Sequence, residues 1–249
     1  MRTGSRAAGA AIPSGRRREG RFLLQKKSDP ARSVTRAVYF IVIFLAFQIL
    51  FNAVPAYLYY SSAIDYNTLG FVSTAAVSLA FSATAVTYLY LVEKSRKGVI
   101  ERLGLGRDKL TLGNILIGAF LFLIIFALEI VVTLVSSTTG VQINTNVSLV
   151  FAGAPVWFLL FASVLAPVNE EVLFRGLMVP RLGVAASALL FAIPHLTYDS
   201  TFAIEFLAAF VFGLLAGYVF KRTNSLYPSV IAHMLVNTLT LASMFSFLI

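Results

Sequence analysis

Side chains that could carry proton-transfer chemistry lie within apolar stretches of the last hundred residues. They are, in chain order, Glu170, Glu171, Arg175, His195, His233 and Asn237. A charged group at the centre of a bilayer costs about 2.5–3.5 kcal/mol on insertion scales, so such residues are candidates for function by default. Carboxylates and imidazoles exchange protons, and an amide donates and accepts hydrogen bonds. Two further acids in apolar stretches, Glu129 and Glu205, are expected to be paired or to reach an interface.

The spacing of these residues predicts that they share one depth in the membrane. Glu170 lies 11 residues before Arg181, which marks the basic end of its stretch. His195 and Asn237 each lie 11 residues beyond the start of their own stretches, and His233 lies 7 residues in. At about 1.5 Å per residue these separations are roughly 16 Å and 10 Å. Polar groups on three helices that agree in depth indicate a shared cavity.

Spacing within one helix separates the two neighbouring acids. Glu171 and Arg175 are four residues apart with the acid first, the favourable order for an ion pair. Glu170 points about 100° away around the helix, so it can remain unpaired. Pro167 and Pro194 precede the acid and the first histidine, and each removes a backbone donor and can kink its helix. An embedded ion pair can equally serve only to hold helices together.

Three motifs formed by these residues resemble those of the CPBP family, also called the Abi or type II CAAX prenyl protease family. Residues 170–176 (EEVLFRG) resemble its EExxxR signature, residues 191–195 (FAIPH) its FxxxH motif and residues 233–237 (HMLVN) its HxxxN motif. The similarity covers about residues 150–240. It implies an intramembrane endopeptidase, a peptide hydrolase whose site lies within a helical bundle.

The resemblance also implies a role for each residue. In the family the first Glu and the FxxxH histidine activate a water molecule, which here implicates Glu170 and His195. The last His and Asn stabilise the oxyanion, which implicates His233 and Asn237. Loss of one oxyanion donor typically lowers the rate by about 10²–10³-fold.

The implied substrate is a membrane-anchored protein or peptide, with C-terminal CAAX-type prenylated tails among the candidates. The ion pair of Glu171 and Arg175 would support the site, and no cofactor is required by this mechanism. The lipid bilayer is the other expected partner. Nothing in the sequence indicates an oligomeric state.

Two alternatives remain open at this stage. Glu170, His195 and His233 could form a zinc site with an open fourth position, although the chain has no HExxH motif. The embedded polar groups could instead serve a non-catalytic membrane scaffold, an immunity protein or a transporter. A transporter should show repeat symmetry between its halves, and the polar groups here lie in one half only.

The composition supports a membrane protein. Hydrophobic residues make up 58 % of the 249 residues and charged residues 12 %, and the mean hydropathy is +0.84. These values argue against a water-soluble globule. The chain has no cysteine, which excludes disulfides, cysteine zinc sites and thiol nucleophiles.

Long apolar stretches predict an all-α polytopic transmembrane bundle of about seven spans, with the catalytic core in the last four. The expected spans are 37–60, 70–92, 112–135, 149–177, 184–196, 201–220 and 226–249. The fifth is short for a spanning helix. The domain organisation follows as a tail at 1–36, N-terminal spans over 37–135 and a protease core over 149–249.

The charges predict the orientation. Residues 1–36 hold ten Arg or Lys and two acids, and are expected to form a disordered cytoplasmic tail. The connector at 93–111 is also basic and is expected to lie on the inner membrane surface. Connectors 61–69 and 136–148 hold no Lys or Arg. The positive-inside rule then gives a cytoplasmic N-terminus, in the plasma membrane if the source is prokaryotic.

This orientation has two consequences. A basic tail beside membrane spans acts as a cytoplasmic retention signal, so no nucleic-acid partner is expected. The protease core is expected to open toward the cytoplasm.

Overall fold

The structure is a computed structural model, and every element that it describes is helical. It describes residues 30–95, 98–140, 151, 153–198 and 203–246. Five of the described helices are long and apolar enough to cross a membrane. The all-α membrane bundle expected from the sequence is therefore confirmed.

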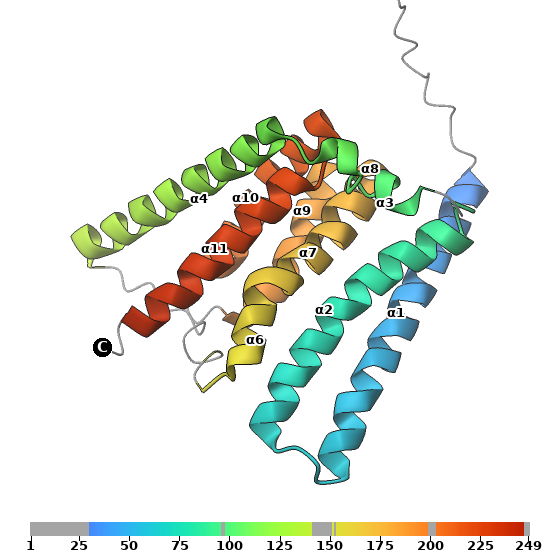
Figure 1. The fold of residues 1–249 in the computed structure, drawn as a ribbon, viewed down its shortest axis with the longest axis horizontal. Helices are drawn as coiled ribbons and strands as arrows, with labels where there is room; N and C mark the ends of the chain where they lie inside the picture. Colours follow the sequence, from blue (N-terminus) through green and yellow to red (C-terminus); the bar gives the residue numbers. More distant parts are fainter. Residues whose placement is uncertain (1–29, 96–97, 141–150, 152, 199–202, 247–249) are drawn as a thin grey trace, which may run out of the picture.

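The chain begins with a long helical hairpin. Helix α1 (Pro30–Tyr60) packs along α2 (Tyr66–Leu91), and the pair lies beside the rest of the bundle (Figure 1). Asp65 caps α2, because its side chain accepts a hydrogen bond of 2.7 Å from the Thr68 backbone N–H. Since α1 begins at Pro30, the last seven residues of the expected tail at 1–36 are helical. Residues 1–29 lie outside the described part.

The connector between α2 and α4 is partly helical. It contains one helical turn, α3 (Val99–Arg102), and a 3-10 turn, η1 (Arg107–Lys109). Leu103, just after α3, is 1 % exposed and belongs to the hydrophobic core. The connector is therefore anchored in the bundle. It leads into α4 (Leu112–Thr139), which lies along α11 (Figure 1).

One continuous helix, Val156–Leu182, holds the first motif. Its successive parts are α6 (Val156–Leu160), η2 (Phe161–Leu165), α7 (Ala166–Glu171), η3 (Val172–Met178) and α8 (Val179–Leu182), where η2 and η3 are π-helical. The expected span was 149–177. The helix starts later because Gly153 has a φ of +72° and Pro155 has an extended backbone, which a helix cannot contain.

Three further elements complete the bundle. They are α9 (Val184–Ala192) with its 3-10 extension η4 (Ile193–Tyr198), α10 (Ile204–Thr223) and α11 (Tyr227–Ser246). Helices α9 and α10 pack closely because Gly213 faces Ala188, where a Cβ atom on the glycine would lie 2.9 Å from the alanine Cα. Small residues allow such close helix contact.

The described helices include five that match expected spans at full length. The five full-length candidates are α1 from Ser33, α2, α4, Val156–Leu182 and α10. The expected fifth span is a shorter apolar helix, Val184–Leu196. The expected seventh corresponds to α11. Seven crossings remain a prediction, because 13 residues of helix span less than a bilayer core.

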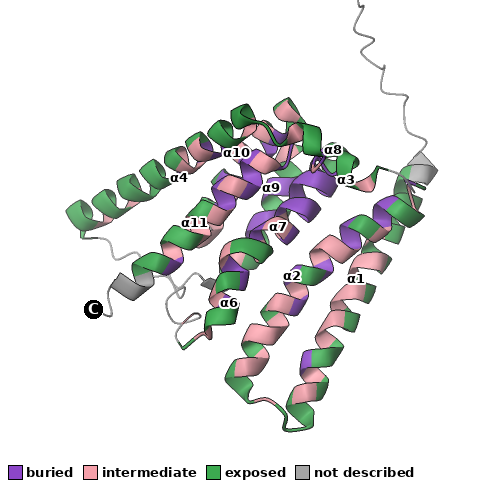
Figure 2. Ribbon diagram, viewed as in Figure 1, coloured by how far each residue is buried: buried purple, intermediate pink, exposed green. Residues whose placement is uncertain are grey.

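Burial identifies the centre of the bundle. Buried residues concentrate in α7, η3, α9 and the basic ends of α10 and α11, whereas much of α1 and α4 is exposed (Figure 2). Every residue from Val172 to Val179 is buried. The helix with the first motif is thus central, and α2, α9, α10 and α11 pack against it.

Candidate active site

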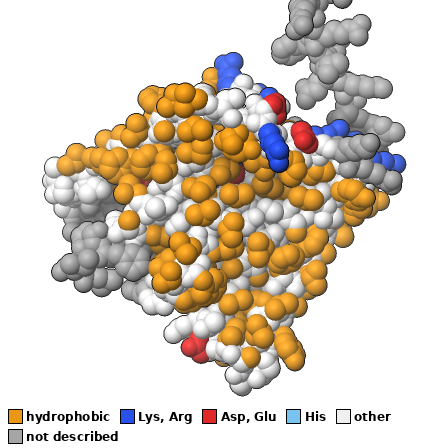
Figure 3. Space-filling view, in the orientation of Figure 1, with side chains coloured by type: hydrophobic (Ala, Val, Ile, Leu, Met, Phe, Trp, Pro, Cys, Tyr) orange, Lys and Arg blue, Asp and Glu red, His pale blue; other side chains and the backbone are white. Residues whose placement is uncertain are grey.

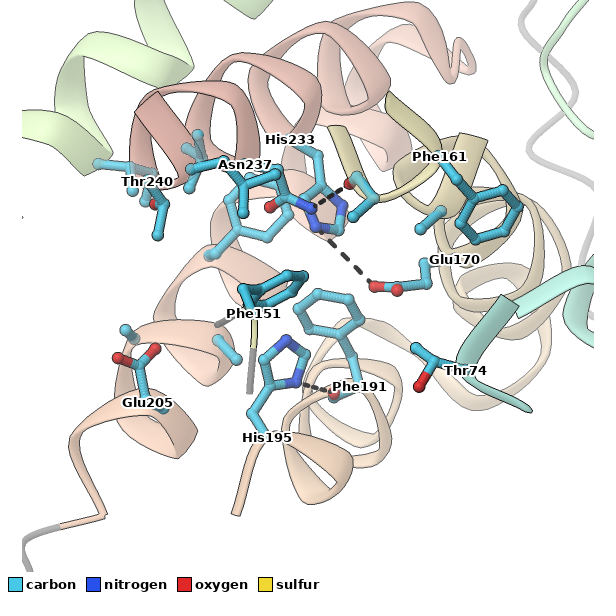
Figure 4. Close-up of a pocket in the computed structure, with 18 of the residues that line it drawn as sticks. Thr74, Phe151, Phe161, Glu170, Phe191, His195, Glu205, His233, Asn237 and Thr240 are labelled. Carbon is cyan, nitrogen blue, oxygen red and sulfur yellow. Dashed lines mark hydrogen bonds and ion pairs between the residues drawn. The ribbon is translucent and has the colours of Figure 1, made fainter. Parts of the chain in front are cut away.

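The four residues implicated in catalysis line one cavity of about 200 Å³ (Figure 4). Glu170 comes from α7, His195 from η4, and His233 and Asn237 from α11. These elements are far apart in the sequence. The fold brings their polar side chains, which the spacing of the three motifs predicts to lie at similar depth, to the same cavity. The rest of the wall is largely aromatic and aliphatic.

His233 lies between the two acids of the first motif. Its Nδ1 is 3.0 Å from Glu171 Oε1, and its Nε2 is 3.8 Å from Glu170 Oε2. An ionised carboxylate only accepts hydrogen bonds, so Nδ1 carries the proton that it shares with Glu171. Nε2 is therefore the nitrogen that faces Glu170. Its distance from Oε2 allows one water molecule to hydrogen-bond to both groups.

Glu171 also pairs with Arg175, as its spacing predicts. Arg175 Nη1 lies 2.8 Å from Glu171 Oε1, and the side chains are 1 % and 0 % exposed. Within the described residues neither Nη atom makes a hydrogen bond of good geometry. The guanidinium instead lies over two aromatic rings, 4.1 Å from the centre of Phe191 and 5.1 Å from that of Phe212. Charge pairing and cation–π contact together compensate its burial.

Phe191, the first residue of the FxxxH motif, contacts both histidines. Its ring centre is 5.0 Å from that of His195 and 5.6 Å from that of His233. Its backbone carbonyl oxygen lies 3.1 Å from His195 Nδ1. A carbonyl only accepts, so this contact places a proton on Nδ1 and makes Nε2 the basic nitrogen of neutral His195. Phe191 thus fixes the orientation of His195 as well as packing the site.

Asn237 has a backbone partner that the sequence did not reveal. Its Nδ2 donates to the carbonyl oxygen of Ala162 over 2.9 Å. In the π-helical turn the Ala166 N–H bonds to Phe161, and the next donor along the chain would belong to Pro167, which has none. The amide of Asn237 therefore satisfies a carbonyl that the helix cannot. Nδ2 carries a second hydrogen, so the amide can still donate to another group.

The zinc alternative would use Glu170, His195 and His233 as ligands. No group of three His, Asp or Glu side chains in the described ranges is arranged to hold a metal ion. The Glu170–His233 pair is separated by 3.8 Å, and Glu171 and the Phe191 carbonyl engage the histidine Nδ1 atoms. A metal-bound histidine also turns its other ring nitrogen to such an acceptor, so zinc binding by Glu170, His195 and His233 remains a prediction to be tested.

Two acids outside the motifs line the same cavity. Glu129 of α4 and Glu205 of α10 are both part of its wall. Sequence reasoning expected them to be paired or to reach an interface. The sequence alone could not place them in the cavity, because a single acid in a spanning helix does not indicate which neighbouring helix it faces.

A polar clip joins the N-terminal hairpin to the catalytic helix. Asn169, next to Glu170, accepts a 2.6 Å hydrogen bond from Ser82 and donates one of 3.2 Å to Ser78. Both serines are in α2, four residues apart on one face. The clip fixes α7 against α2 at the residue before the proposed base. The one sequence signal for it was this serine spacing.

Replacing Asn169 by Ala is expected to lower the free energy of unfolding by about 1–3 kcal/mol, because it leaves the buried Ser78 hydroxyl without its donor. Thermal denaturation in detergent measures the change. Asn114→Ala is the matched control, since this amide bonds to a connector carbonyl outside the bundle core. Equal stability of the Asn169 variant and the unmodified protein would contradict a clip between α2 and α7.

The comparisons with known proteins agree with this site. Residues 152–239 match the family model described as "Type II CAAX prenyl endopeptidase Rce1-like". The matched segment runs from the start of the Val156–Leu182 helix through Asn237, so it contains all three motifs. No curated protein and no solved structure matches the chain. The resemblance drawn from the motifs is thereby confirmed, and it supports a peptide hydrolase of the membrane.

Proposed function

We propose, from the match of residues 152–239 to the Rce1-like family model, that this protein is an intramembrane endopeptidase that hydrolyses peptide bonds of membrane-associated polypeptides. The observation that carries the proposal is the convergence of Glu170, His195, His233 and Asn237 on one cavity. A carboxylate, two imidazoles and an amide suffice for hydrolysis, since they supply a base, a second proton acceptor and oxyanion donors.

In the proposed reaction Glu170 accepts a proton from a water molecule that His195 Nε2 helps to hold. The oxygen of that water attacks the carbonyl carbon of the peptide bond. The carbonyl oxygen becomes an oxyanion, which the second N–H of Asn237 and the His233 ring stabilise. The Glu171 carboxylate, 3.0 Å from Nδ1, orients that ring. Glu170 then returns the proton to the leaving nitrogen, and the carbon–nitrogen bond breaks.

The lining of the cavity favours an apolar substrate segment. Phe151, Phe158, Phe161, Phe191 and Phe212 form much of its wall. The family description names CAAX prenyl substrates, and an isoprenoid chain beside the scissile bond would suit such a wall. C-terminal prenylated tails are therefore one candidate substrate, and unmodified apolar segments of membrane-anchored proteins are another.

Cleavage of a peptide library by the purified protein tests the proposal. The library contains prenylated CAAX peptides and unmodified apolar peptides, and Glu170→Ala protein is the control. We expect a short C-terminal product from the unmodified protein only. If neither protein releases a product from any peptide, while both are folded, the non-catalytic scaffold or immunity alternative is favoured.

Zinc dependence is tested in the same assay. The proposed mechanism routes no step through a metal, so we expect cleavage to survive EDTA and purification without zinc. Metal analysis is expected to find well under one equivalent. Loss of cleavage with 1,10-phenanthroline, restored by added zinc and not by removing the chelator alone, would instead assign Glu170, His195 and His233 as zinc ligands.

A further inference from the structure

The cavity extends in only one direction from the catalytic groups. Among the described residues its lining covers 158–170 of the long helix, 205–212 of α10, 233–241 of α11 and 125–129 of α4. In α10 these are the first half of the helix, and in α11 and α4 they follow the first turns. Each set of lining residues therefore lies either level with the catalytic groups or farther than they do from the basic connectors.

The opposite end of the bundle is closed by the connector between α2 and α4. The carbonyl of Gly104 accepts a 3.0 Å hydrogen bond from the N–H of Leu226, and Tyr227 Oη donates to Leu105 over 3.1 Å. Leu103 packs on Gly176, where a Cβ atom would come within 3.0 Å of it. Leu103 and Leu226 are 1 % and 0 % exposed. This end is filled by close-packed side chains.

Charges identify the closed end as the basic face. Glu93, two residues after α2, binds Arg181 of α8 at 2.6 Å and Arg102 of α3 at 3.4 Å. Arg181 also donates to the carbonyl of Leu177. Lys and Arg side chains gather at this edge of the molecule, above a wide hydrophobic belt (Figure 3). The basic connectors therefore share one face, and the cavity extends toward the other.

We propose that substrate reaches the catalytic groups from the membrane face opposite the basic connectors, and that the packed connector at 99–106 seals the basic face. The inference rests on the proposed function for its substrate. It is the opposite of the expectation that the core opens toward the cytoplasm, and labelling in vesicles distinguishes the two. Since positive charge marks the cytoplasmic side, the entry lies on the extracytoplasmic side.

This direction narrows the substrate class. Prenylated CAAX tails are anchored in the cytoplasmic leaflet, which is the sealed side. The substrate is therefore a polypeptide with an apolar segment whose scissile bond lies in the extracytoplasmic half of the membrane. The phenyl rings of Phe151 and Phe158, which stack with centres 5.7 Å apart on the cavity wall, would contact that segment.

Cysteine labelling tests the direction without relying on activity, because the chain has no cysteine of its own. Ala208→Cys places a thiol in the cavity wall, and Leu207→Cys, its neighbour on α10 outside the lining, is the matched control at the same depth. Asp108→Cys and Thr139→Cys report the two faces, since both positions are exposed. A charged, impermeant methanethiosulfonate is added to right-side-out and to inverted vesicles.

We expect Ala208→Cys to react from the side that labels Thr139→Cys and not from the side that labels Asp108→Cys, with Leu207→Cys unreactive from both. Reaction of Ala208→Cys only from the Asp108 side, or from neither side, would overturn the proposal. The same modified protein is then assayed for cleavage. A loss specific to labelled Ala208→Cys supports the substrate route, and unaltered cleavage overturns it. Failure of the unmodified protein to cleave any peptide would instead count against the proposed function.

Discussion

Glu170→Gln is expected to abolish measurable hydrolysis while leaving the fold intact. The amide has nearly the same shape as the carboxylate but cannot accept a proton from water. General-base catalysis contributes about 10²–10⁴-fold to a rate, so at least this factor should be lost. Glu170 makes no ion pair with a Lys or Arg among the described residues, so its neutralisation strands no buried cation. Single-turnover cleavage of the library peptide measures the loss.

The matched control is Glu101→Gln, the same chemical change at an exposed position in α3. Both variants should elute as the unmodified protein does and unfold at a similar temperature. Turnover retained by a purified Glu170→Gln protein would show that another group takes the proton. Since Glu129 and Glu205 line the same cavity, they would be the next carboxylates to replace.

The part of the site that could be predicted from the sequence is the part set by local geometry. Helical periodicity alone pairs Glu171 with Arg175 and turns Glu170 to a different face. Residue counting from the basic ends places His195 and His233 near the same depth. The structure has the ion pair at 2.8 Å and brings these groups to one cavity. Such predictions succeed because they need no knowledge of which helices touch.

The features that could not be predicted depend on tertiary packing or on a departure from α-helical hydrogen bonding. Asn237 binds Ala162 only because the helix is π-helical before Pro167, and a sequence does not reveal that change. Asn169 binds α2 only because that helix is its neighbour. Leu103 is buried in the bundle core although it belongs to a connector between helices, and the sequence does not indicate that contact.

Glu171→Ala is expected to cost about 3–5 kcal/mol of stability, because it leaves the Arg175 guanidinium buried without its counter-charge. The two aromatic rings beneath the guanidinium offset only part of that loss. The folded yield after detergent extraction should fall sharply, and the rate of any folded fraction should fall as well. Size-exclusion chromatography and thermal denaturation measure the first effect, and cleavage by the monodisperse fraction measures the second.

A double substitution separates the two roles of Glu171. Glu171→Ala with Arg175→Met removes both charges, so we expect most of the lost stability to return, as it does when buried ion pairs are replaced by apolar residues. Activity should remain low, because His233 Nδ1 has lost the carboxylate 3.0 Å away that orients its ring. Recovery of cleavage together with stability would show that Glu171 serves only to neutralise Arg175. A single Glu171→Ala protein as stable as the unmodified one would contradict the buried pair itself.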